Sequence, residues 1–164
     1  MATMIITKCL KSYDINAYDK DGWTPLHRTV IYEEPELCRL LCERGDVDVY
    51  KGYKYGGKTG YCFPGNTALH EAARTGSMEC MRILLDVGKA NVNAKKNLSN
   101  TPLHSAALGG RIEAATLLIE RGAEINLIND SNKTPLDIAH EYSETELIAF
   151  LKTKGAVRAP QPVA

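Results

Sequence analysis

The sequence predicts an all-α repeat solenoid of stacked helix-turn-helix units, which are joined by β-hairpin-like fingers, one of them extended. The main observation is the phrase Thr-x-Leu, which begins at Thr24, Thr67, Thr101 and Thr134 and so recurs after 43, 34 and 33 residues. A glycine follows each of these threonines after 21 residues, and two apolar residues follow after 16 and 17 residues. A period of this length indicates repeats that bury their apolar faces only by stacking on one another.

Each phrase opens the first helix of its unit. Threonine is a favoured N-cap, and proline is favoured at the next position because its missing N–H would be unpaired there. The small pairs Ala72-Ala73 and Ala106-Ala107 follow in the two middle units. These small side chains allow neighbouring first helices to approach closely.

The second helix of each unit follows a short turn, which contains Gly76 or Gly110 in the two middle units. Apolar residues then recur at helical spacing, as in Met78, Met81 and Leu85. In the last unit, the segment 143–146 (Ser-Glu-Thr-Glu) predicts a capping box that starts the final helix.

The phrase Thr101-Pro102-Leu103-His104, followed by Ala106 and repeated with a period near 33 residues, resembles the ankyrin repeat. The resemblance covers about residues 14–156 and implies a single domain over residues 1–156. Its expected parts are an N-terminal half-repeat cap (1–17), four repeats (about 18–50, 60–93, 94–126 and 127–156) and a finger insertion (50–65), followed by a flexible tail (157–164).

The composition indicates which classes of partner and which cellular compartment to expect. Twenty basic residues balance twenty acidic ones, so the net charge gives no reason to expect nucleic acid or an anionic membrane as partner. No apolar run approaches the ~20 residues that span a bilayer. The five cysteines are odd in number and have no paired spacing, which favours reduced thiols and a cytoplasmic or nuclear location. We expect a monomer.

The 43-residue interval places nine extra residues in one finger, Tyr50 to Gly65. This segment carries five aromatic residues and three lysines but no acidic residue. Two interpretations stay open. The insertion has no role, since surface loops lengthen at little energetic cost, or its aromatic and cationic side chains form a binding edge.

His27, His70 and His104 occupy the same position in three repeats. Stacked repeats place equivalent residues in a row about 10 Å apart, so we expect each imidazole to bind its threonine cap and the neighbouring turn. Cys38 and Cys42 lie on one helical face but lack a matching ligand pair, which favours core packing over a zinc site. Motifs of phosphate-binding loops, nucleophile elbows and zinc proteases are missing from the sequence, so we expect neither enzymatic activity nor a cofactor or metal.

The resemblance to ankyrin repeats implies a non-catalytic module that binds another protein through its finger tips and the concave face of its first helices, in a regulatory or inhibitory role. One alternative is an adaptor or scaffold subunit that presents a client to an enzyme. Another, of a different class, is an enzyme or metal-binding protein. The positions implied as partner contacts are Tyr18, Lys20, Asp21, Trp23, Ile31, Tyr32, Tyr53, Tyr55, Tyr61, Phe63, Arg74, Thr75, Lys95, Asn97, Leu98, Leu108, Asp130 and Tyr142.

Two positions have a second interpretation. Trp23 is either an interface hot spot or a side chain that packs under the base of the extended finger. Asn126 ends the segment 118–126, whose Leu-x5-Glu-Ile-Asn pattern resembles the ankyrin-repeat target of an asparaginyl hydroxylase. The alternative role of Asn126 is to hydrogen-bond backbone groups in its finger.

Overall fold

The computed structural model describes residues 14–54 and 65–160 of the chain. Within these ranges the backbone forms eight α-helices and one isolated β-bridge, between Lys96 and Asn100. The helices are α2 (Pro25–Ile31), α3 (Pro35–Glu43), α4 (Ala68–Thr75), α5 (Met78–Asp86), α6 (Pro102–Leu108), α7 (Ile112–Glu120), α8 (Pro135–Glu141) and α9 (Thr145–Thr153). The predicted all-α repeat solenoid is confirmed. Most of the half-repeat cap expected over residues 1–17 lies outside the described residues.

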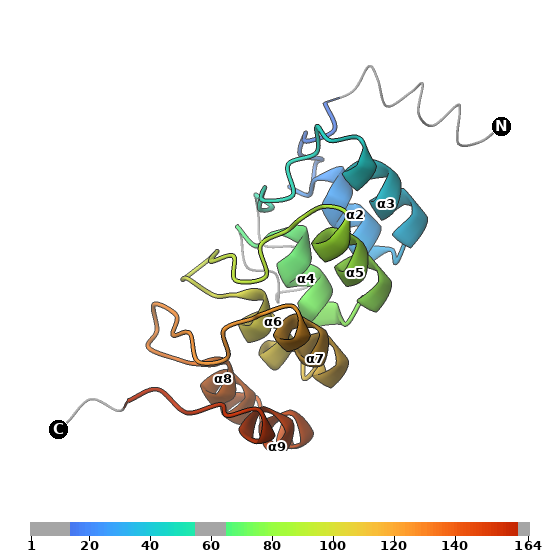
Figure 1. Cartoon of the computed structure of the whole chain (residues 1–164). Helices are drawn as coiled ribbons and strands as arrows, with labels where there is room; N and C mark the ends of the chain where they lie inside the picture. The colour runs from blue at the N-terminus through green and yellow to red at the C-terminus, as the bar shows by residue number, and fades with distance from the viewer. Residues whose placement is uncertain (1–13, 55–64, 161–164) are drawn as a thin grey trace.

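The helices form pairs that stack in a row, with α2 and α3 at one end of the stack and α8 and α9 at the other (Figure 1). The first helices α2, α4, α6 and α8 pack on one another in that order, and α3, α5, α7 and α9 form the second layer. The described parts of the connections that lead into the first helices extend to one side of both layers. We call them fingers: the first covers residues 14–23, the second 48–66, the third 91–100 and the fourth 124–133.

The helix ends follow from local chemistry. Thr67 and Thr101 each form a reciprocal capping box with the histidine three residues later, and Thr134 forms one with Asp137. The capping box predicted at 143–146 is wrong. The backbone of Ser143 is left-handed (φ of 59°), so this residue still belongs to the turn before the helix. Helix α9 therefore begins at Thr145, and its N-cap is Glu144, which makes no side-chain capping hydrogen bond.

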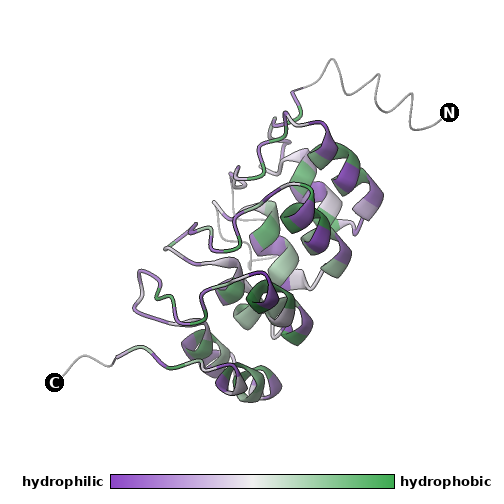
Figure 2. Cartoon of the chain, viewed as in Figure 1, coloured by the Kyte–Doolittle hydropathy of each residue, from purple (hydrophilic) through white to green (hydrophobic). Residues whose placement is uncertain are grey.

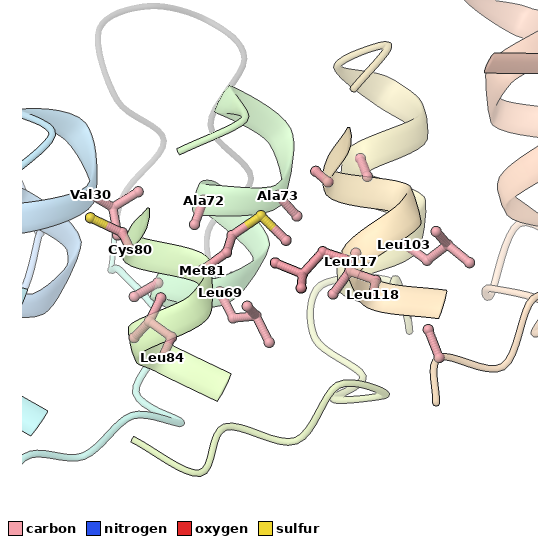
Figure 3. Packing of buried hydrophobic residues seen from close by; sticks show 14 of the residues in the cluster. Val30, Leu69, Ala72, Ala73, Cys80, Met81, Leu84, Leu103, Leu117 and Leu118 are labelled. Atoms are coloured by element: carbon pink, nitrogen blue, oxygen red, sulfur yellow. The ribbon is translucent and has the colours of Figure 1, made fainter. Parts of the chain in front are cut away.

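The core runs along the whole stack between the two helix layers. Figure 3 shows Leu69, Met81 and Leu84 of the second repeat beside Leu117 and Leu118 of the third, and all five belong to one buried cluster. The helices in Figure 2 show one apolar and one polar side, while the fingers are mainly hydrophilic. The repeats therefore bury their apolar faces against one another, as the period predicts.

The segment after α9 corrects one expectation. Asp137 accepts hydrogen bonds from the Ala159 N–H (2.8 Å) and from Arg158 Nε (2.7 Å), and the Thr134 hydroxyl donates to the Val157 carbonyl (2.9 Å). Residues 157–160 therefore lie bound along the last repeat, and the prediction of a free tail from residue 157 is wrong for them. The remaining residues 161–164 are outside the described ranges.

Candidate functional site

The fingers share one closing hydrogen bond, which locates the insertion. The backbone N–H of Asp19 donates to the Trp23 carbonyl, Lys96 to Asn100 and Asn129 to Lys133, each across four positions. In the second finger the N–H of Tyr53 donates to the Asn66 carbonyl (3.1 Å), across thirteen positions. In the sequence, the nine extra residues therefore fall between residues 51–54 and residues 65–66, which keep the ordinary pairing; we call these two flanking segments the neck.

The three equivalent histidines link one repeat to the next. Nε2 of His27 lies 3.0 Å from the Asn66 carbonyl, Nε2 of His70 lies 3.1 Å from that of Asn100, and Nε2 of His104 lies 3.0 Å from that of Lys133. A carbonyl oxygen only accepts, so each Nε2 carries the proton and donates. The other ring nitrogen, Nδ1, then accepts from the threonine cap, with oxygen-to-nitrogen distances of 2.7–2.9 Å. The predicted structural role of these histidines is confirmed.

The environment of these imidazoles suits hydrogen bonding and opposes acid–base catalysis. Burial lowers the pKa of His27 and of His70 to about 4, and it also lowers the pKa of His104. The rings are therefore neutral at physiological pH, and both of their nitrogens are occupied. Within the described ranges, no three His, Cys, Asp or Glu side chains are grouped so as to hold a metal ion.

Two of the expected contact residues are buried, which corrects the prediction for Trp23 and Tyr53. Their side chains are 5% and 1% exposed, and their ring centroids lie 4.2 Å apart. His27 completes the aromatic cluster, with its ring centroid 5.5 Å from that of Tyr53. The neck of the second finger turns Tyr53 inward onto Trp23. The alternative interpretation of Trp23, packing under the base of the finger, is therefore the one observed.

Other contacts fasten the base of the second finger to the first. The Tyr18 hydroxyl donates to the Gly52 carbonyl (2.9 Å), and the Lys51 ammonium lies 4.5 Å from the centroid of the Tyr18 ring. Gly52 faces the Gly65 carbonyl so closely that a Cβ atom would lie 2.1 Å from that oxygen. The two sides of the neck are thus held together by backbone contact.

Several predicted contact residues do lie on the surface, although they are far apart along the stack. Tyr32 (65% exposed) and Tyr142 (47%) follow the ends of α2 and α8, and Leu98 (56%) stands at the tip of the third finger. Lys20, Lys95 and Asp130 are also exposed, as is Tyr18 (39%). The half-buried ones are Asp21, Ile31, Arg74, Thr75, Asn97 and Leu108. Tyr55, Tyr61 and Phe63 lie outside the described residues.

Two of the predicted contact residues, Asp21 and Arg74, already form ion pairs within the chain. Arg28 binds Asp19 through Nε (2.6 Å) and Asp21 through Nη2 (2.7 Å), which ties the first finger to α2. Arg74 pairs with the buried carboxylate of Glu71 on the same helix. Asp21 and Arg74 therefore have structural partners already.

A groove of about 180 Å³ lies between the third and fourth fingers and the helices α6 and α8. Its apolar lining consists of Leu98, Leu108, Ile138 and Tyr142. Asn66, which is 3% exposed, also lines it, and its side-chain Oδ1 has no hydrogen-bond partner among the described residues. Lys133 and Glu141, which form an ion pair, also line the groove. The groove thus combines apolar walls with an ion pair and one unused polar atom, a common composition of binding sites.

A row of asparagines lies along the finger bases, and the sequence predicted a hydrogen-bonding role only for Asn126. Asn126 donates from Nδ2 to the Gly155 carbonyl (3.2 Å) and accepts from the Val157 N–H (2.9 Å), and Asn16 and Asn93 do the same in their repeats. Tyr50 stands at the equivalent position of the second finger and donates its hydroxyl to the Lys89 carbonyl (3.1 Å). The alignment of residues 48–50 (Asp-Val-Tyr) with 91–93 (Asn-Val-Asn) and 124–126 (Glu-Ile-Asn) indicates these equivalent positions in the sequence.

Cys38, Cys42 and Cys80 are free and buried, as the prediction of core packing for the first two requires. The hydrogen bond with Cys42, together with burial, raises the pKa of Cys38 to about 12. None of the described helices has the length and apolar character needed to cross a bilayer.

Comparison with known proteins agrees with this geometry. A family model described as ankyrin repeats in three copies matches residues 3–95, 59–129 and 96–159. The chain is 30% identical over 151 residues to the B-cell lymphoma 3 protein homolog of Mus musculus, a match that covers 90% of this chain and 32% of the relative.

Two further relatives match over most of the chain. Diacylglycerol kinase iota of Rattus norvegicus is 32% identical over 132 residues, which are 79% of this chain and 13% of the relative. The target of rapamycin complex 2 subunit AVO2 of Saccharomyces cerevisiae is 25% identical over 142 residues, which are 87% and 32%. The chain thus spans about a third or less of the length of these relatives.

Proposed function

The chain belongs to the ankyrin-repeat family, and we propose that it is a non-catalytic module that binds another protein through its finger tips and the concave face of its first helices, in a regulatory or inhibitory role. The observation that carries the proposal is the set of exposed apolar side chains on that face, Tyr32, Leu98 and Tyr142. Apolar residues presented on a rigid scaffold mark interaction sites. The buried histidines and threonines behind them all have structural partners.

The proposal includes a monomer in the cytoplasm or nucleus, without nucleic-acid or membrane partners. The three unpaired buried thiols support a reducing compartment. The adaptor or scaffold role is the second candidate. It is supported by the relative that is described as a subunit of a complex, and an adaptor would hold two proteins at once.

Affinity capture from the lysate of the source cells tests the proposal. One bait is the intact chain, and the second carries Leu98→Ser and Tyr142→Ser. The control bait carries Val157→Ser, which changes another exposed apolar side chain, in the segment that follows α9 and outside the lining of the groove. We expect a partner that the intact and control baits retain and that the double variant loses. Equal recovery of all proteins on the three baits would refute binding through this face.

The extended finger is tested separately by a chain in which a single aspartate replaces residues 55–64. Loss of the partner would assign a binding role to the finger, and full retention would favour the neutral insertion. Two partners recovered together, each lost with a different variant, would favour the adaptor over the inhibitor.

A further inference from the structure

The third finger and the groove beside it carry a charge pattern that the net charge of zero conceals. From Val87 to Ile112 the sequence contains Lys89, Lys95, Lys96 and one arginine, but no aspartate or glutamate. Lys89 and Lys95 are exposed and Lys96 is half-buried. Among the ion pairs of the described residues, none involves these three lysines. Their charge is therefore not neutralised by the residues that the structure describes.

An exposed leucine stands immediately beside these lysines. Asn97, Leu98 and Ser99 have φ values of 37°, 57° and 59°, so three consecutive residues other than glycine are left-handed. Such a backbone is strained for residues other than glycine. The Asp130 N–H donates to the Leu98 carbonyl (2.9 Å), which fastens this tip to the fourth finger. Leu98 thus stays outward on an anchored tip.

The groove next to Leu98 has an unmet polar group at its floor. Oδ1 of Asn66 is buried and without a partner among the residues that the structure describes, whereas Oδ1 of the equivalent Asn100 accepts from Asn129 (2.8 Å). A buried acceptor that makes no hydrogen bond is costly to leave unpaired. An incoming N–H group would satisfy it, and backbone or side-chain amides of a peptide provide such donors.

From these three features we infer that the third finger and its groove bind an acidic peptide segment of a partner protein, which places an apolar side chain against Leu98, Leu108 and Tyr142 and its carboxylates on Lys95 and Lys96. The inference rests on the proposed function and names the chemistry of the partner. Oppositely charged groups around an apolar anchor give both orientation and specificity to such a contact.

A nucleic acid fits the same surface less well. The positive charge of this surface comes from Lys95 and Lys96 of the third finger and from Lys89, two residues before it. On the fourth finger the exposed Asp130 carries negative charge. Glu141, which lines the groove, is paired with Lys133 (2.6 Å), so these two charges offset each other there. A long polyanion would meet the Asp130 carboxylate, and three lysines supply few of the phosphate contacts on which such binding depends.

Selection from a displayed library of random twelve-residue peptides tests the inference on the whole chain. The targets are the intact chain, the variant Lys95→Glu/Lys96→Glu, and the matched control Lys152→Glu/Lys154→Glu, which makes the same charge change at exposed positions in the last turn of α9 and at its C-cap. All three are first shown to melt alike. Twelve-residue oligouridylate is titrated in parallel.

We expect Asp and Glu to be enriched at least about twofold among peptides selected by the intact chain. The best peptide should lose at least about tenfold in affinity for the Lys95/Lys96 variant and less than about twofold for the control. Leu98→Ser should weaken the same peptide severalfold at an unchanged melting temperature.

Three results would overturn the inference: selected peptides without acidic enrichment, acidic peptides that bind both charge variants equally, or no selected peptide at all. Tighter binding of oligouridylate than of the best peptide would assign the face to nucleic acid instead. The proposed function fails separately, when lysate capture shows no dependence on Leu98 and Tyr142. If the lysate capture depends on Leu98 and Tyr142 but the peptide selection fails, the proposed function holds and the partner segment is not acidic.

Discussion

Nε2 of His70 in the second repeat lies 3.1 Å from the carbonyl oxygen of Asn100 in the third. The ring is buried, its pKa is lowered to about 4 by that burial, and its Nδ1 is occupied by the Thr67 cap. One neutral imidazole therefore closes its own helix and holds the finger of the next repeat. The same pair of contacts recurs at His27 and His104, so the row of histidines couples the repeats.

This coupling predicts a loss of stability in mild acid. His27 and His70 have a folded pKa of about 4 and an ordinary value of 6.5, so between these values the unfolded chain binds more protons. Their stabilisation is complete above pH 6.5 and declines as the pH falls toward 4. The free energy of unfolding should fall by on the order of 2 kcal/mol per histidine between pH 7 and pH 5. Urea titrations at both pH values measure it, and equal midpoints would contradict the prediction.

Substitution separates the buried histidines from the remaining one. His70→Ala removes a donor to Asn100 and an acceptor for Thr67, and it leaves buried polar groups unpaired. We expect it to lower the free energy of unfolding by on the order of 3 kcal/mol. His140 is half-buried near the end of α8, and His140→Ala should change stability by less than about 0.5 kcal/mol. Denaturant titrations of the two variants would refute the assignment if their losses were alike.

The sequence predicts this part of the structure well because the repeats sample each position several times. Threonine, proline and histidine at fixed offsets identify the caps, and the row of histidines follows from stacking. Tyr53 was not predictable in the same way. At the equivalent position Asp19 and Asn129 accept N–H groups of their own fingers, whereas Tyr53 lacks such an acceptor and fills an aromatic cluster. Only the folded neck shows which way its ring points.

The end of the chain escaped prediction for a related reason. Asp137 replaces the histidine of the earlier repeats, so its position presents an acceptor where they present a donor. The residues it binds, Arg158 and Ala159, lie in a segment without periodicity. Sequence patterns report repeated contacts, and this contact occurs once.

The stack of Trp23 on Tyr53 predicts the energetic role of the neck. Trp23→Ala should destabilise the chain by about 3–5 kcal/mol, because it removes a large buried side chain. The exposed Tyr32 is the control, and Tyr32→Ala should cost less than about 0.5 kcal/mol. A double-mutant cycle with Tyr53→Ala should give a coupling of about 0.5–1.5 kcal/mol. Additive losses would show that the rings stabilise the fold independently.

The Asp137 contact predicts protection of the C-terminal segment. Burial raises the pKa of Asp137, but hydrogen bonds from Ala159, Arg158 and Thr134 outweigh it and hold the pKa at about 2. This stabilisation is therefore present above pH 3.8 and is lost as the pH falls through 2. At neutral pH, Asp137→Ala should release the segment and cost about 1–3 kcal/mol. Trypsin should then cut after Arg158 several times faster than in the intact chain or in the control Asp130→Ala. Equal cleavage rates would exclude the protective role.

The neck also predicts what happens when the insertion is removed. Gly22 and Gly65 are equivalent, since their N–H groups donate to the carbonyls of Asp19 (3.0 Å) and Tyr53 (2.8 Å) and both are left-handed, with φ values of 82° and 93°. Two residues separate Asp19 from Gly22, and eleven separate Tyr53 from Gly65. One aspartate in place of residues 55–64 therefore restores a finger of ordinary length and keeps Lys54, whose N–H donates to the Gly22 carbonyl (2.8 Å).

Because the neck already holds its ends together, the shortened finger should fold without strain. The entropic cost of closing a loop is smaller for a shorter loop, so the shortened finger should raise the free energy of unfolding by about 1.5 kcal/mol. The control for the neck is Gly52→Ala, which places a methyl group against the Gly65 carbonyl and should destabilise both the long and the short chain by a similar amount. A short chain that is less stable than the original would show that the inserted residues make contacts on which the fold depends. The insertion would then be part of the structural core, and its tyrosines would be poor candidates for an exposed binding edge.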